Sequence, residues 1–146
     1  MDSIYQGALL DHSCNPTCRR VLANATHTHE GVNASCGDDV TLSLVLDESN
    51  VIQEAAFTGN GCAVSQASAD IMASVISGKP LAEAVELADA FIAMIDGAEP
   101  TPEQKEALGE AAELQGVSRM PARAKCAQLG WRTLQEIAAD LAASAV

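Results

Sequence analysis

The sequence predicts an α+β fold, in which a small antiparallel three-stranded sheet carries helices packed mainly on one side. Residues 40–46 alternate apolar and polar side chains, the two-residue period of a strand with one buried face. From residue 63 onward, apolar side chains instead recur every three or four residues, as they do along amphipathic helices. With 146 residues, the chain has the length of one domain, and we expect residues 1–146 to form it.

Three strands are expected in the first half of the chain. Residues 26–33 form a short polar segment typical of an edge strand, and residues 40–46 form the strand with the clearest alternation. The sequence Asp47-Glu48-Ser49-Asn50 favours a turn, and residues 51–58 then return as the third strand. His27 and His29 alternate along the edge strand, where we expect them to face solvent or a partner.

Helices are expected before and after these strands in the sequence. Residues 4–23 have broadly helical spacing interrupted by Asn15-Pro16, which predicts a helix, a stop and a short helical turn. Gly78-Lys79-Pro80 is a stop signal, and Thr101-Pro102-Glu103-Gln104 is a capping box. The four later helices are expected at 63–77, 81–95, 102–115 and 122–143.

The charge of the chain excludes some partners. A formal net charge of −12 argues against nucleic acid or an anionic membrane as a partner, because phosphates are bound through Lys and Arg. The acidity favours a partner with a basic surface, or it serves only solubility. No segment reaches the roughly 18–20 apolar residues of a membrane span, and no signal peptide is recognisable, so we expect a cytoplasmic protein. In that compartment, five cysteines indicate metal or redox chemistry more than disulfides.

Three of the cysteines have distinctive surroundings. Cys36 lies in Ser35-Cys36-Gly37-Asp38, Cys62 follows the glycine loop Gly59-Asn60-Gly61, and Cys126 ends Arg123-Ala124-Lys125-Cys126. Three thiols and the Asp38 carboxylate make a four-ligand set that Zn²⁺ accepts readily. From spacing alone, a shared metal and separate buried thiols remain equally open.

The local sequence around each thiol favours its thiolate form. The glycine after Cys36 allows a sharp turn, so that this thiol and Asp38 can face one metal. The glycine loop places Cys62 at a helix N-terminus, where the helix dipole favours a negative charge. Cys126 is expected in the first turn of the last helix, beside the cations Arg123 and Lys125.

Four motifs in the same order connect the chain to a known family. They are Asp11-His12 with Asn15-Pro16, the Cys36 motif, the Cys62 motif with Ser65 and Ala67-Ser68-Ala69, and the Cys126 motif with Trp131. In these motifs the chain resembles the IscU-like iron–sulfur cluster assembly family, and within it the SufU type, over nearly its whole length.

The resemblance implies a function and a set of site residues. Zinc would be held by Cys36, Asp38, Cys62 and Cys126, and Cys36 would be the acceptor of persulfide sulfur. The donor would be a SufS-type, pyridoxal-phosphate-dependent cysteine desulfurase, which Arg123 would help to orient, and downstream iron–sulfur assembly proteins would receive the sulfur. The alternative is a scaffold in which the same thiolates hold a transient [2Fe–2S] cluster.

Several residues separate the two branches of the family. The scaffold branch typically has a histidine before its last cysteine and a Leu-Pro-Pro-Val-Lys segment; this chain has Lys125 and no such segment. Cys62 and Cys126 are 64 residues apart, leaving room for an extra helix, and Arg123 precedes Cys126 by three positions. These features resemble SufU. The deaminase and His-Glu-x-x-His signatures are absent, which argues against a zinc hydrolase.

The sequence leaves two assignments open. Asp39 could compete with Asp38 as the oxygen ligand, although only Asp38 matches the family's Cys-Gly-Asp motif. Cys14 and Cys18 depart from the family pattern; their spacing could support a metal or a disulfide, but Pro16 lies between them and incidental packing is favoured.

Overall fold

The computed structural model describes residues 7–14, 16–34 and 37–144. Three antiparallel strands form the sheet, in the order β1-β2-β3 with the second strand central, as the sequence predicts. In this register Gly31 pairs with Val40, and Leu42 pairs with Phe57. The strands are β1 (His27–Asn33), β2 (Asp38–Leu46) and β3 (Ile52–Thr58).

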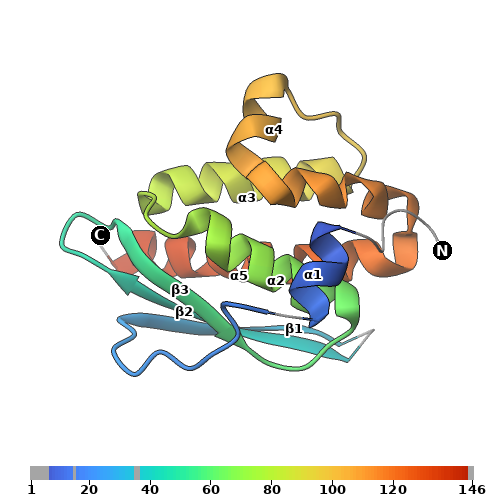
Figure 1. The fold of residues 1–146 in the computed structure, drawn as a ribbon. Helices are drawn as coiled ribbons and strands as arrows, with labels where there is room; N and C mark the ends of the chain where they lie inside the picture. The colour runs from blue at the N-terminus through green and yellow to red at the C-terminus, as the bar shows by residue number, and fades with distance from the viewer. Residues whose placement is uncertain (1–6, 15, 35–36, 145–146) are drawn as a thin grey trace.

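The helical elements lie mainly on one side of the sheet, which confirms the predicted α+β class (Figure 1). Helices α2 and α5 contact the strands directly, and α3 packs against α5. Along β2, side chains alternate between buried and half-buried, so one face of the sheet supplies the core. The elements are α1 (Ala8–Cys14), α2 (Ala63–Ile76), α3 (Leu81–Ile95), α4 (Pro102–Leu108), the 3-10 helix η2 (Gly109–Arg119) and α5 (Pro121–Ser144).

A buried tryptophan fixes α5 against its neighbours. The Trp131 ring stacks on Phe91 of α3 with a centroid separation of 4.4 Å. The indole N–H of Trp131 donates to the Ser68 hydroxyl of α2 over 3.1 Å, and that hydroxyl donates to the carbonyl of Ala127 over 2.6 Å. The polar atoms of this buried group are paired, so their hydrogen bonds offset the cost of desolvation where α2 and α5 meet.

Small residues let α2 and α5 approach closely. A Cβ atom added to Gly130 would lie 3.6 Å from Ala69 and 3.3 Å from the methyl group of Met72. Packing of this kind holds the start of α2, which carries Cys62, in a fixed position relative to α5, which carries Cys126. The helix pair is therefore the frame for the candidate site.

The predicted helix over 102–115 is correct at its start and wrong at its end. The capping box is present: the Gln104 N–H donates to Thr101 Oγ1 over 3.1 Å, and the Thr101 N–H donates to Gln104 Oε1 over 2.9 Å. The α-helix stops at Leu108, because Gly109 adopts a positive φ of 58°. The chain then continues as η2 to Arg119.

The short helical turn expected after Asn15-Pro16 does not form. Residues 18–20 instead run beside β3, where the Phe57 N–H donates to the Cys18 carbonyl and the Arg20 N–H donates to the Phe57 carbonyl, both over 3.0 Å. Pairing with the open edge of β3 satisfies these backbone groups, so it replaces the local helical preference.

None of the helices in the described part of the chain is both long and apolar enough to cross a membrane.

Candidate metal centre

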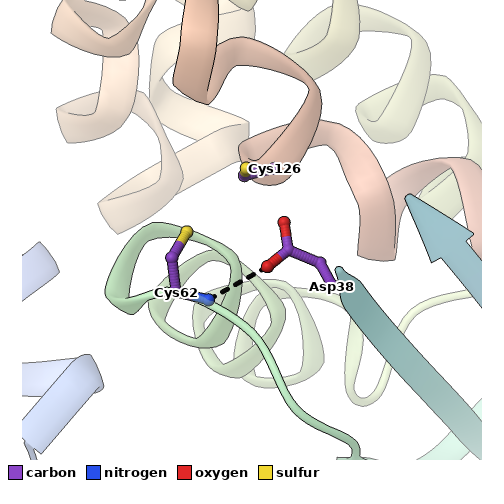
Figure 2. Close-up of side chains that lie close together, drawn as sticks. All are labelled: Asp38, Cys62 and Cys126. Atoms are coloured by element: carbon purple, nitrogen blue, oxygen red, sulfur yellow. Dashed lines mark hydrogen bonds between the residues drawn. The ribbon is translucent and has the colours of Figure 1, made fainter. Parts of the chain in front are cut away.

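Three of the four predicted ligands lie together at one end of the sheet. Asp38 begins β2, Cys62 precedes the first residue of α2, and Cys126 lies in α5 (Figure 2). One carboxylate oxygen and the two sulfur atoms all lie within 4.8 Å of one another. Cys36, the fourth predicted ligand, lies outside the described residues.

The Asp38 carboxylate is the polar centre of this group. The side chain is buried, and its Oδ1 accepts a hydrogen bond of 3.0 Å from the Cys62 N–H. Its Oδ2 is buried and has no hydrogen-bond partner among the described residues. A buried acceptor left unpaired costs about 1–3 kcal/mol, a cost that a bound cation would remove. One carboxylate oxygen and two thiols are also donors that Zn²⁺ prefers, so the residues present fit zinc.

Strand alternation places the two adjacent aspartates on opposite faces of the sheet. Asp38 points to the buried face of the sheet, whereas Asp39 points to the other face and is half-buried. Asp39 instead holds the glycine loop: its N–H donates to the Asn60 carbonyl over 2.7 Å, and its Oδ1 accepts from the Asn60 N–H over 3.3 Å. Of the two, only Asp38 lies beside the thiols of Cys62 and Cys126.

The two glycines before Cys62 are required by close contacts. A Cβ atom on Gly61 would lie 2.7 Å from Asp38 Oδ1 and 2.2 Å from Ser65 Oγ. Gly59 has a φ of +133°, and a Cβ atom there would lie 2.3 Å from the Asp39 carbonyl oxygen. The loop can therefore approach β2 closely enough for the Cys62 N–H to reach the carboxylate.

Cys62 occupies the predicted place at a helix start. It is the N-cap residue of α2, with extended backbone angles (φ −72°, ψ 169°) and a half-buried side chain. The position predicted for this thiol, at the N-terminus of a helix, is therefore confirmed.

Cys126 differs from its prediction by about one turn. Because α5 begins at Pro121, a residue type favoured at the first helical position, Cys126 lies in the second turn and is fully buried. Its sulfur lies 3.9 Å from the Ala122 carbonyl oxygen and 4.0 Å from Nδ2 of Asn33, at the end of β1. Nothing in the sequence signalled the contact between Asn33 and this sulfur.

Arg123 and Lys125 are exposed in the first part of α5. The backbone N–H of Arg123 donates to the Met120 carbonyl over 2.8 Å, which helps to start the helix. The role of Arg123 toward a partner stays a prediction.

The two additional cysteines lie apart from this cluster. Cys14 is exposed at the end of α1, and Cys18 is half-buried against the core residues. Burial raises the pKa of the Cys18 thiol, which disfavours its reactive form. Neither belongs to a group of metal-ligating side chains within the described residues.

The histidines make contacts that the sequence did not indicate. His29 faces α5 rather than solvent, with Nε2 2.6 Å from Glu136 Oε2. His12 bridges two elements: its Nδ1 lies 2.5 Å from Oδ2 of the fully buried Asp70, and its Nε2 lies 3.1 Å from Oε2 of Glu110. Burial alone would lower the pKa of His12, but the two carboxylates together raise it. The one sequence feature that could have indicated this contact is Asp70, an acidic residue within the apolar run of α2.

Comparisons with known proteins agree with this arrangement. A family model described as the NifU-like N-terminal domain matches residues 4–127. The chain is 37% identical over 136 residues to the zinc-dependent sulfurtransferase SufU of Bacillus subtilis, covering 93% of this chain and 90% of that protein. It is 40% identical over 136 residues to the iron–sulfur cluster assembly scaffold protein IscU of Streptococcus pyogenes, covering 93% and 83%.

A solved structure shows the same fold. It is described as an iron–sulfur cluster assembly scaffold protein for the SUF system from Fervidobacterium islandicum, and it superposes with a TM-score of 0.84 at 35% identity. The match covers 94% of this chain and 98% of that one. The chain therefore belongs to the NifU-like N-terminal domain family. The resemblance to the IscU-like assembly proteins of the SufU type is confirmed.

Proposed function

We propose that this protein is a zinc-dependent sulfur acceptor, which takes persulfide sulfur from a cysteine desulfurase for iron–sulfur cluster assembly. The observation that carries the proposal is the buried, unpartnered Oδ2 of Asp38 beside the thiols of Cys62 and Cys126. The 37% identity to the zinc-dependent sulfurtransferase SufU supports zinc as the metal.

In this proposal zinc is held by Cys36, Asp38, Cys62 and Cys126. Bound there, it would keep the thiols deprotonated and protect them from oxidation. The Cys62 N–H fixes the carboxylate through Oδ1, which leaves Oδ2 for the metal. Reduced thiols are needed throughout, so the cytoplasm is the compartment that suits the protein.

Cys36 is the proposed sulfur acceptor. It adjoins Gly37, whose φ of +72° and open surroundings mark a turn beside Asp38. Its thiolate would attack the terminal sulfur of the desulfurase persulfide, forming a persulfide on Cys36 and releasing the enzyme's cysteine as a thiolate. The partner is a pyridoxal-phosphate-dependent enzyme of the SufS type, which Arg123 would help to orient, and downstream assembly proteins would receive the sulfur.

Mass spectrometry after incubation with desulfurase and cysteine, without oxygen, tests this function. We expect the peptide that contains Cys36 to gain one sulfur atom, and Cys36→Ala to abolish the gain. Cys14→Ala removes an exposed thiol outside the cluster and should leave the gain intact. Undiminished sulfur acceptance by Cys36→Ala would overturn the assignment.

A scaffold function is the second candidate, supported by the 40% identity to IscU of Streptococcus pyogenes. In that case the thiolates would hold a transient [2Fe–2S] cluster as cargo. Such clusters absorb visible light and zinc does not, so the colour of protein purified without oxygen separates the two functions.

A further inference from the structure

A cleft adjoins the candidate metal centre on the side of α5 and the end of β1. It has a volume of about 350 Å³ and is lined by Val32, Asn33, Lys125, Leu129 and Arg132. Two of these residues connect it to the metal centre: Asn33 reaches the sulfur of Cys126 at 4.0 Å, and Lys125 directly precedes that cysteine. A molecule bound in the cleft would therefore lie next to the site of the proposed chemistry.

One helix face supplies most of the cleft. Lys125, Leu129 and Arg132 follow one another at spacings of four and three residues, which aligns them on α5. The opposite wall is the end of the edge strand β1, where Val32 is 60% exposed. The surface thus combines two cations with an apolar side chain that is unusually open to solvent.

The charge of this cleft runs against the composition of the chain. The sequence has 20 acidic and 8 basic residues, yet both charged residues lining the cleft are cations. Neither Lys125 nor Arg132 forms an ion pair with any described residue. Another cleft, at α3 and α4, has the opposite character and is lined by three glutamates, Glu83, Glu86 and Glu103.

We propose that this cleft docks an acidic segment of the cysteine desulfurase, in which a carboxylate meets Lys125 and Arg132 and a neighbouring apolar side chain covers Val32. The inference rests on the proposed function, since it names the surface by which the sulfur donor is recognised. It reverses the expectation from the net charge of −12, because the charge beside the site differs in sign from that of the whole chain. Complementary charges at the rim of an interface mainly raise the association rate and the specificity.

Binding of the zinc-loaded protein to the source organism's desulfurase, measured without cysteine so that no sulfur moves, tests the inference. We expect Arg132→Glu to raise the Kd about tenfold at low salt, Arg132→Gln to raise it by less, and both differences to shrink as salt screens the charges. Arg132→Lys keeps the charge and should bind nearly as the wild type does. Lys125 is left unchanged because it adjoins a proposed zinc ligand.

Lys105→Glu is the control for charge: it makes the same charge change on an exposed residue of α4, where it also removes the ion pair with Glu99. It should bind as the wild type does. Unchanged binding by Arg132→Glu, or equal weakening by Lys105→Glu, would overturn the inference, and equal zinc content and melting temperature would show that the variants are folded. Binding that depends on Arg132 without any sulfur transfer would support the cleft and remove the proposed function. A wild type that does not bind the enzyme at all would remove both.

Discussion

Gly61→Ala should damage the metal centre without removing a ligand. The new methyl group would lie 2.7 Å from Asp38 Oδ1 and 2.2 Å from Ser65 Oγ, and both distances are too short for a carbon atom. The Ser65 hydroxyl can rotate away, but the carboxylate is held by the Cys62 N–H, so the loop and Asp38 must separate. Overpacking of this kind costs about 2 kcal/mol.

Two assays measure the consequence. In a thermal melt, a loss of about 2 kcal/mol should lower the melting temperature by about 4–8 °C in a chain of this size. In a competition with a chromophoric chelator, zinc affinity should fall by about tenfold to a hundredfold, the usual effect of disturbing a group that orients a ligand.

Gly97→Ala is the control for this experiment. Gly97 has a φ of +112° after the end of α3, with no atom within 4 Å of an added Cβ, so alanine introduces backbone strain without a clash. That strain costs about 1–3 kcal/mol. We expect the control to lose stability and keep its zinc affinity. Wild-type zinc affinity in Gly61→Ala would refute the reasoning that the glycine loop positions Asp38.

Three further outcomes are expected. Asp38→Ala should lower zinc affinity by at least about tenfold in chelator competition, while Asp39→Ala should change it little; the reverse order would contradict the choice of ligand. Removal of zinc by a chelator should lower the melting temperature, since zinc present at about a hundred times its Kd contributes about 2.7 kcal/mol; an unchanged melt would argue against a bound metal. His12→Gln should destabilise the protein most at low pH, because the carboxylates of Asp70 and Glu110 raise the His12 pKa above 6.5. The stabilisation is complete below 6.5 and is lost as pH rises through the folded-state pKa, so melting curves of the two proteins should converge at alkaline pH.

The elements that were predicted well from sequence are those with local causes. The strand over β2 follows from strict alternation, and the start of α4 follows from the Thr101 capping box. Gly109 was a local signal that the helical pattern of its neighbours obscured, so the end of α4 was placed too late.

The same distinction between local and non-local causes holds for the residues of the candidate site. The glycines around Cys62 made its position at a helix start predictable, and strand alternation separates Asp38 from Asp39 once the register is known. Contacts between distant segments were not predictable, because no local pattern records them. The amide of Asn33 lies beside Cys126, which is 93 positions away in the sequence. His12 contacts Asp70, which is 58 positions away.

X-ray absorption spectroscopy at the zinc edge of the zinc-loaded protein tests the central claim most directly, since it counts the sulfur and oxygen atoms bound to the metal. We expect a zinc shell of three sulfur neighbours at about 2.3 Å and one oxygen at about 2.0–2.2 Å. A shell with fewer sulfur atoms, or with histidine nitrogen, would contradict it.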